Sequence, residues 1–400
     1  MPNNSNKTAA AFWDVGRSQP RDLAFTPNDI SAHLLQDWWP GAPPARGRSF
    51  MGWPSYIFQP GQATGPLTLN DRVRQTERQW KMMLSWMLGV AGTRHFLLND
   101  GYPWIAPVSA FWWDTRRFVR VQAWNMRVRM PTFAASRGPK PRILAPDYIA
   151  AKVASNGALE IAVVESKGTP ENLAARTESR KSWRDQAGNL TLHLNRAKAE
   201  PARCIVVATR VNPNAKKETS RAIQIRAWNR NDGTKQDLWP ALTHIASKQL
   251  IGLLTNLRRE EDVKLLLEAE RRRAKADEDE NTPNLFSQSP RPEDEADKPR
   301  RNVDEIGSAE DDLDPERGSI IPVDADGHNF EVFLSPDLVR LIRGLQESAT
   351  TEQAGASVET ADDSLRRWYN RESEGAKDSL TTVLPIGVIV RSKSPVTQAV

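Results

Sequence analysis

The apolar positions of residues 69–89 follow the spacing of a helix that is buried along one face. They recur at intervals of three and four residues, which brings them onto one side of a helix. The stripe consists of Val73, Trp80, Met83, Leu84, Met87 and Leu88. Gly89 or Gly92 is expected to end this helix, because glycine is common just beyond a helix C-terminus.

Residues 146–169 have the pattern of a β-hairpin. Two apolar runs flank the dipeptide Asn156-Gly157, and Asn-Gly between such runs is the strongest short-range signal for this motif. Polar side chains stand at the open end, with Asp147 before the first strand and Glu165 and Lys167 in the second. Because side chains alternate between the faces of a strand, Glu165 and Lys167 project together.

The length of the turn decides whether Asp147 shares that face. Directly opposed residues of an antiparallel pair lie on the same face. A two-residue loop would place Asp147 opposite the residue after Glu165, on the wrong side. A three-residue loop, closed by Gly157 in the left-handed conformation, places Asp147 opposite Glu165 and pairs the two alanines at 154 and 158. We therefore predict the bulged hairpin, which gathers two carboxylates and an ammonium group at one strand end.

The pattern of the rest of the core predicts an α/β fold. The expected elements are a strand at 118–130, a polar helix at 171–187 that ends at Gly188, a strand at 204–208, loops at 212–240 and a long helix from Pro240 beyond Leu267. A helix that connects two strands of one sheet makes those strands parallel. The predicted order is therefore helix, three strands, helix, strand, with a mixed sheet flanked by helices.

Composition divides the chain into four parts. Residues 1–65 are rich in Pro, Gly and Trp and are expected to form a mostly irregular arm. Residues 66–274 contain the core and its C-terminal helix. Residues 275–317 are acidic and poor in aliphatic side chains, as in a disordered linker. Residues 318–400 are expected to form a small α+β module that recruits a protein partner.

The expected elements of this module come from its local signals. They are a strand from Ser319, a turn at 324–327, a strand at 329–334, a helix from Pro336 capped by Ser335, a helix near 362–371 and a strand at 386–390. The long helix before the linker has an apolar stripe, which we expect to cover the core. The alternative is that this stripe forms a homo-oligomer interface.

The net charge of +5 conceals an uneven distribution. Residues 1–274 contain 41 basic and 23 acidic side chains, a net charge of +18, whereas 275–317 and 318–400 carry −9 and −4. A basic body suits a polyanionic partner such as DNA, and RNA is permitted equally. The N-terminal residues lead into no apolar segment, and no apolar run approaches the ~18 residues of a membrane span. A cytoplasmic protein with no membrane contact is expected.

Tryptophan is unusually common. The chain has 14 tryptophans, concentrated between Trp13 and Trp124. A large apolar ring usually packs in a core or under a loop. Stacking on nucleobases is the alternative use of some of them.

The hairpin residues indicate metal chemistry. Two carboxylates on one patch repel each other unless a cation lies between them. Oxygen ligands favour Mg²⁺, or Mn²⁺ in its place, over zinc. A lysine such as Lys167 beside this site can hold the attacking water and offset charge on a phosphorane-like transition state. The alternative is an ordinary surface hairpin with a Glu–Lys pair.

The pattern Pro146-Asp147 followed by Glu165-Ser166-Lys167 resembles the PD-(D/E)xK nuclease superfamily, which has the restriction-endonuclease-like fold. The resemblance covers roughly residues 70–215. It implies that Asp147 and Glu165 bind the metal, that the backbone carbonyl of Ser166 completes the shell and that Lys167 positions the water. The core order predicted above is also that of the superfamily.

The resemblance implies further residues around the site. In some members the first helix carries an acidic ligand, and Glu77 is the glutamate in that position here; its alternative is a solvated pair with Arg74 or Arg78. The second helix often projects a basic or amide side chain toward the site, and the candidates are Lys181, Arg184 and Gln186. Arg127 and Arg129 belong to a basic run before Asp147 that suits a phosphate backbone.

The sequence thus predicts a Mg²⁺-dependent endonuclease that acts on DNA and leaves a 5′-phosphate. Phage defence, restriction and mobile-element processing are equally compatible settings. The alternative is an inactive nuclease-like fold that serves as a DNA-binding or scaffold subunit of a larger complex. The sequence contains no H-E-x-x-H, C-x-x-C or phosphate-binding G-x-x-x-x-G-K-[ST] pattern that would favour a zinc site or an ATPase.

Overall fold

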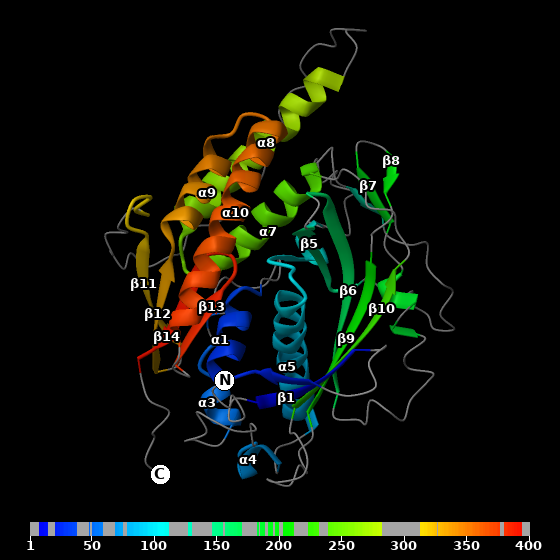
Figure 1. Cartoon of the computed structure of the whole chain (residues 1–400), viewed down its shortest axis with the longest axis vertical. Coiled ribbons are helices and arrows are strands. Elements are labelled where there is room, and N and C mark those ends of the chain that lie inside the picture. Colours follow the sequence, from blue (N-terminus) through cyan, green and yellow to red (C-terminus); the bar gives the residue numbers. More distant parts are fainter. Residues whose placement is uncertain are drawn as a thin grey trace, which may run out of the picture.

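The fold is seen in a computed structural model (Figure 1). The residues that it describes are 8–14, 21–37, 48, 50–58, 69–74, 78–111, 127–129, 146–154, 157–169, 182–183, 185–188, 191–194, 197–199, 203–211, 223–231, 239–281, 313–325, 327–376 and 380–393.

A mixed sheet of seven strands forms the centre of the body, in the order β2-β1-β10-β9-β6-β5-β3. Its strands are β1 (Thr8–Asp14), β2 (Arg21–Ala24), β3 (Trp104–Pro107), β5 (Tyr148–Val153), β6 (Leu159–Thr169), β9 (Arg203–Val211) and β10 (Ile223–Asn231). β3, β5 and β6 are antiparallel neighbours, and β9 lies parallel to β6. The parallel pairing predicted for the strand at 204–208 is therefore confirmed, and the chain is an α/β protein with helices on both faces of the sheet.

Successive residues of β6 enter two different cores, one on each face of the sheet. Ile161 and Val163 pack with α7 (Trp239–Asn256), whereas Ala162 and Val164 pack with α5 (Arg78–Asn99). This alternation follows from the pleat of a strand. A strand that is apolar on both sides must be covered twice, which explains why β6 lies between two helical layers.

α5 lies unusually close to the sheet because small residues line the contact. A Cβ atom on Gly168 of β6 would lie 1.5 Å from the Ser85 carbonyl oxygen, and one on Gly92 would lie 2.3 Å from Thr209 Oγ1. The expectation that Gly89 or Gly92 ends the helix is wrong, since α5 continues to Asn99. These glycines permit close approach of helix and sheet instead of terminating the helix.

The predicted stripe of the first helix is only partly buried. Leu84, Met87 and Leu88 are buried in the core on the α5 face of the sheet. Trp80, expected to belong to the stripe, is 46% exposed. Residues 71–74 are helical as α4 (Asp71–Arg74), and residues 75–77, between α4 and α5, lie outside the described residues.

The first strand of the core is β3, and the strand expected at 118–130 does not take that place. Only residues 127–129 of that segment are described, as β4 (Arg127–Arg129). β4 pairs with β7 (Thr191–Leu194), and with β8 (Ala197–Ala199) they form a separate three-stranded sheet. Alternation predicts a strand but does not identify the partner with which the strand pairs.

The N-terminal segment is more regular than its composition suggests. β1 and β2 join the main sheet, α1 (Pro27–Leu35) packs beside α5, and α3 (Pro54–Ile57) packs beside α1. β1 lies parallel to β10, in a region expected to be loops. The partner of β1 lies about two hundred residues away, so a local pattern does not show it, whereas β10 also pairs along its whole length with β9, the strand before it. A local signal for α1 does exist, since Thr26 and Asp29 form a capping box with Pro27 at the first turn.

The long helix expected from Pro240 is two helices. α7 ends at Asn256, and α8 (Glu260–Asn281) begins after a turn in which Arg258 has a φ of 58°. Of the linker expected at 275–317, residues 275–281 continue α8 and residues 313–317 form a described turn. Residues 282–312 lie outside the described residues, so disorder there stays a prediction.

The C-terminal part contains a four-stranded sheet and two helices. They are β11 (Ser319–Ala325), β12 (His328–Leu334), β13 (Thr381–Leu384), β14 (Val388–Ser392), α9 (Pro336–Glu347) and α10 (Thr351–Gly375). Ser335 caps α9 by accepting a hydrogen bond from the Leu338 N–H at 3.2 Å, as predicted. α10 extends well beyond the expected 362–371, and the strand expected at 386–390 is shifted to 388–392, with β13 as its partner.

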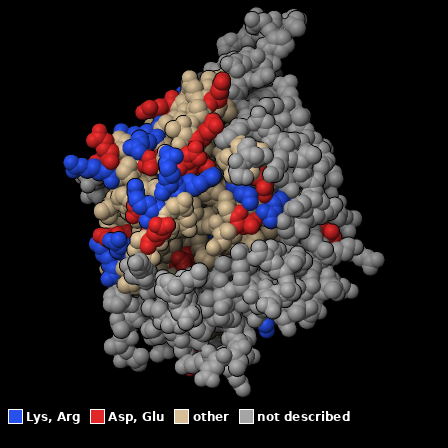
Figure 2. Space-filling model, in the orientation of Figure 1, with Lys and Arg blue, Asp and Glu red and all other residues tan. Residues whose placement is uncertain are grey.

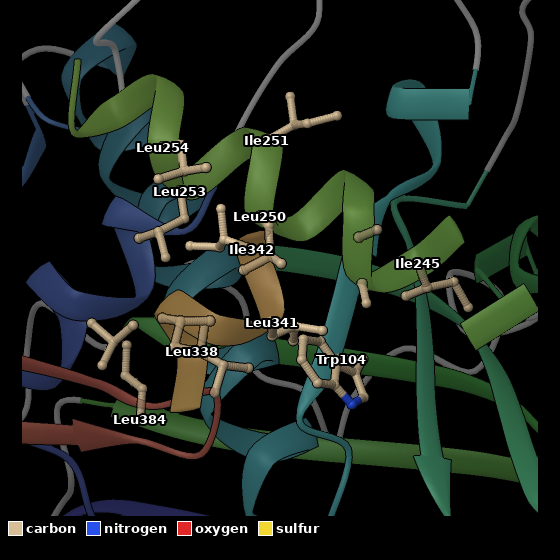
Figure 3. Close-up of a cluster of buried hydrophobic side chains, with 14 of the residues drawn as sticks. Trp104, Ile245, Leu250, Ile251, Leu253, Leu254, Leu338, Leu341, Ile342 and Leu384 are labelled. Atoms are coloured by element: carbon tan, nitrogen blue, oxygen red, sulfur yellow. The ribbon is translucent and has the colours of Figure 1, made fainter. Parts of the chain in front are cut away.

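The C-terminal part shares one hydrophobic core with the main sheet. Figure 3 shows Leu250 and Leu253 of α7 against Leu338 and Ile342 of α9. Buried polar contacts accompany this packing: the Trp104 indole N–H donates to Asp362 Oδ1 at 3.0 Å, and Asn28 Nδ2 donates to the Val390 carbonyl at 3.0 Å. The sequence boundary near residue 318 is therefore not a boundary in packing.

Figure 2 shows basic and acidic side chains interspersed over the C-terminal helices and strands on the face that it presents. This face of the C-terminal part thus carries charges of both signs. In the described part of the chain, no helix combines the length and apolar character needed to cross a membrane.

We predict that Gly168→Ala lowers the free energy of unfolding by about 1–3 kcal/mol, because the new methyl group must displace the α5 backbone at Ser85. Gly375→Ala is the matched control, since a Cβ there meets no atom within 4 Å. Urea unfolding of both variants checks this prediction. Equal midpoints for the two variants would contradict the tight helix–sheet contact.

Candidate functional site

The hairpin of β5 and β6 has the register that the three-residue loop predicts. Tyr148 pairs with Val164, and the pairing continues without a shift to Val153 and Leu159. At the turn, the Ala154 N–H donates to the Ala158 carbonyl at 2.8 Å, and Gly157 has a φ of +77°. Residues 155 and 156 lie outside the described residues. The bulged register is confirmed, and it places Asp147 opposite Glu165.

Asp147, Glu165 and Lys167 consequently lie on one face of the sheet, the face that α7 covers farther along the strands. Ser166 points to the opposite face, where its Oγ accepts a hydrogen bond from Thr93 of α5 at 2.9 Å. The position of the Ser166 backbone carbonyl as a metal ligand stays a prediction. Its backbone N–H is engaged, because it donates to Asp147 Oδ2 at 2.7 Å.

Lys167 connects the hairpin to the helix that follows it. Its ammonium group contacts Glu165 Oε1 and also donates to Gln186 Oε1 at 3.3 Å. Residues 182–183 and 185–187 are helical, with a turn at Gly188. Of the three side chains expected to project from this helix, the structure therefore brings Gln186 to the site.

The structure does not describe the side chains of the other predicted site residues. Glu77 and Lys181 lie outside the described residues, and so does Arg184. Arg127 and Arg129 are described only as backbone within β4. Within the described ranges, no group of three or more His, Cys, Asp or Glu side chains is arranged to hold a metal ion.

Glu165 is a fully buried carboxyl group with unused hydrogen-bonding capacity. Its side chain has no exposed area, and neither oxygen meets a backbone N–H or hydroxyl in hydrogen-bonding geometry among the described residues. Its neighbours are the Lys167 ammonium and the Asp147 carboxyl. Buried polar atoms are normally satisfied, so an incompletely partnered carboxylate beside a second one fits a divalent cation with oxygen ligands.

Burial raises the pKa of both carboxyls, and the charge of Asp147 raises that of Glu165 further. Desolvation, followed by the charge of Asp147, raises the pKa of Glu165 to about 8, although Lys167 acts in the opposite direction. Desolvation also raises the pKa of Asp147, against the hydrogen bond from Ser166 and the charge of Lys167. Without a cation, the pair therefore retains a proton at neutral pH.

Asp37 is a third carboxyl near the pair, and the sequence pattern did not single it out. It follows α1, and its Oδ1 accepts from the Tyr148 hydroxyl at 3.0 Å and from Arg94 at 3.4 Å. Its charge contributes to the raised pKa of Asp147. The Arg94 side chain that holds it is completely buried. Asp37 lies about a hundred residues from the hairpin, so only the packing of α1 against α5 brings it there.

A second Glu–Lys pair on the same hairpin provides a comparison. Lys152 lies 3.6 Å from Glu160 near the turn. Burial acts to raise the pKa of Glu160, but the Tyr102 hydrogen bond and the charges of Lys152 and Arg203 outweigh it, so this pKa is lowered. Glu160 is thus an ordinary ion-paired carboxylate. Glu165, with its raised pKa and full burial, is not the solvated surface pair that the alternative interpretation of the hairpin requires.

We predict that Glu165→Gln stabilises the metal-free protein more at pH 9 than at pH 6. The carboxyl ionises near pH 4.5 in the unfolded chain but only near pH 8 in the folded protein. Wild-type stability therefore falls as the pH rises through that window, by up to about 5 kcal/mol. Glutamine does not ionise in this range, so the variant does not lose this stability as the pH rises.

Urea unfolding in EDTA at the two pH values measures the difference between variant and wild type. Glu160→Gln is the matched control, because a carboxyl with a lowered pKa is ionised in both states throughout this range and its effect should not change. An effect of Glu165→Gln that is equal at pH 6 and pH 9 would contradict the raised pKa.

Comparisons with family models, with curated proteins and with solved structures found no match to the chain. The functional assignment therefore rests on the geometry of the site: two carboxyls opposed across a hairpin, a lysine in contact with one of them, and an amide from the next helix.

Proposed function

We propose that this protein is a divalent-metal-dependent endonuclease that hydrolyses phosphodiester bonds in DNA. The observation that carries the proposal is the convergence of Asp147, Glu165 and Lys167, in the register set by the bulged turn. A buried pair of carboxyls that must share a proton is costly to maintain. Such an arrangement is more often functional than structural.

The order of elements supports the proposal. α5 precedes β3, β5 and β6, helical residues follow at 182–183 and 185–187, and β9 returns parallel to β6. This order, together with Pro146-Asp147 and Glu165-x-Lys167, is that of the PD-(D/E)xK superfamily to which the sequence bears a resemblance. The restriction-endonuclease-like fold is accordingly part of the proposal.

Asp147 and Glu165 would hold Mg²⁺ or Mn²⁺, with the Ser166 carbonyl as a further oxygen ligand. When bound, the ion supplies a Lewis acid that lowers the pKa of a water molecule and offsets phosphate charge. Lys167 is 27% exposed, so its ammonium can reach a water or a phosphate oxygen from the solvent side. Gln186 accepts a hydrogen bond from that ammonium and so restricts its position.

The distribution of charge supports a nucleic-acid substrate. The excess of basic side chains belongs to residues 1–274, which contain the hairpin. DNA is the substrate that we propose, with a 5′-phosphate on the product, and defence against phage, restriction or processing of mobile elements as the setting. RNA is the competing substrate that an assay must include.

One observation favours the scaffold alternative. Lys167 already contacts Glu165, and among the described residues no three His, Cys, Asp or Glu side chains are arranged to hold a metal ion. A nuclease-like subunit that binds DNA without cutting it would retain the same contacts. Cleavage and metal binding therefore need separate tests.

Asp147→Ala, Glu165→Ala and Lys167→Ala are each expected to lower Mg²⁺-dependent cleavage at least about 100-fold. Binding of the same DNA should change little, because the three residues act on one phosphate. The assay compares supercoiled plasmid, linear duplex, single strands and RNA, each with Mg²⁺ or Mn²⁺. Lys152→Ala is the matched control, because Lys152 pairs with Glu160 at the other end of the same hairpin.

The result that contradicts catalysis is a wild-type protein that binds these substrates and cuts none of them. Loss of cleavage in Lys152→Ala as great as in Lys167→Ala would also refute the assigned site, since it would indicate damage to the hairpin as a whole.

Metal binding is expected to be visible without any substrate. Mg²⁺ or Mn²⁺ at about ten times its dissociation constant should raise the thermal unfolding midpoint of the wild type by about 2 °C. Asp147→Ala and Glu165→Ala should abolish this shift, whereas Lys167→Ala should retain it, since lysine is not a ligand. A shift of wild-type size in Glu165→Ala would exclude the proposed metal site.

A further inference from the structure

A row of four aromatic rings crosses the N-terminal half of α5 and the segment around α3. Trp80 stacks on Trp53 with ring centroids 5.2 Å apart and an angle of 26° between the planes. Trp53 meets Phe50 edge to face at 5.8 Å, and Phe50 meets Trp86 in the same manner at 6.0 Å. We call these four rings the aromatic row.

Both ends of the aromatic row face solvent. Trp80 is 46% exposed and Trp86 is 37% exposed, whereas Trp104 and Trp368 are buried in the cores. Met82, on the same helix, is 62% exposed. Large apolar side chains grouped on a surface indicate a binding site, and the packing of α5 on the sheet does not account for Trp80.

The aromatic row is held by close backbone contacts, and its helix covers the face of β6 opposite to the one that carries the carboxyls. The α5 backbone at Ser85 and Trp86 lies against Gly168, which directly follows Lys167 in β6. At the other side, a Cβ on Gly52 would lie 2.6 Å from the Ala325 carbonyl oxygen. The segment that carries Phe50 and Trp53 is thus wedged between α5 and the C-terminal sheet. Rings held in this way lose little entropy when a ligand stacks on them.

The chain around the aromatic row is basic. The segment 69–86 contains the basic residues Arg72, Arg74, Arg78 and Lys81 and the acidic residues Asp71 and Glu77. Lys81 is exposed and follows Trp80 directly. Exposed aromatic faces next to cations are the recurring pattern of surfaces that bind single-stranded nucleic acids, since each base offers a π-face and each nucleotide a phosphate.

We propose that the aromatic row is a stacking platform for unpaired bases of a single-stranded nucleic acid. The choice of ligand rests on the proposed nuclease function, and it deepens that function by naming a substrate with a single-stranded segment. Trp80 and Trp86 are six residues apart, about 9 Å along the axis of α5. Because six residues also rotate by about 240° around the axis, the two rings would take bases at separate points of one strand, with Lys81 next to Trp80 in the chain.

Fluorescence anisotropy of labelled oligodeoxythymidine and of a duplex of equal length tests the proposal, with the full chain in EDTA so that no cleavage occurs. The variant Trp80→Ala/Trp86→Ala should bind the single strand at least tenfold more weakly, with a smaller change for the duplex. Ile320→Ala is the matched control, because Ile320 is 64% exposed on β11 and lies outside the aromatic row.

Two further variants separate stacking from loss of structure. Trp80→Phe keeps a π-face and should retain most of the affinity, whereas Trp80→Leu keeps apolar bulk and should lose it. Equal affinities of Trp80→Phe and Trp80→Leu for the single strand would overturn the proposal. So would wild-type affinity of the double variant, as expected if the aromatic row binds a protein instead.

The outcome is distinguishable from that of the cleavage assay. If the wild type cuts nothing but the Trp80 variants lose single-strand affinity, the stacking platform stands and the nuclease proposal falls. If the wild type cuts DNA and the Trp80 variants bind and cut single strands as it does, the platform falls and the nuclease stands.

Discussion

The candidate site depends on a single residue in a turn. Gly157 adopts a φ of +77°, which an L-residue with a side chain rarely adopts, and the three-residue loop that results sets the register of β5 and β6. A shift of one residue would turn Asp147 to the other face of the sheet, toward Thr93 and α5. Every contact between the two carboxyls and Lys167 follows from this backbone constraint.

The two faces of β6 carry different kinds of side chain and contact different helices. The face toward α5 is shaped by small residues, with Gly168 against the helix backbone and Ser166 bonded to Thr93. The face toward α7 begins as an apolar core and ends in the carboxyls. Glu165 is therefore desolvated by the same packing that stabilises the sheet, which explains why its pKa is raised while Glu160, near the exposed turn, has a lowered one. Glu160 lies on the other face of β6, where Tyr102, Lys152 and Arg203 hold its pKa down, so the two carboxyls of one strand differ in their surroundings.

The C-terminal part supports the main sheet and the segment that carries Trp53. It completes the core on the α7 face, where Trp104 of β3 donates to Asp362 of α10, and its sheet buttresses the segment that carries Trp53. A role in recruiting a protein partner stays a prediction. Its packing shows a structural role in addition, since it supports both the sheet that holds the site and the aromatic row that we propose to hold the substrate.

The amino-acid sequence by itself determined the local features. The Asn156-Gly157 turn, the alternation along β6 and the Ser335 cap are each set by neighbours within a few residues, so the hairpin register and the proximity of Asp147 to Glu165 could be predicted. Tertiary structure decided what depends on distant partners. β1 joins the main sheet by pairing with β10, Asp37 lies near Asp147 because α1 packs against α5, and Trp80 is exposed although its spacing suggested burial. Such features are stabilised by contacts between segments as much as two hundred residues apart, for which local periodicity carries no signal.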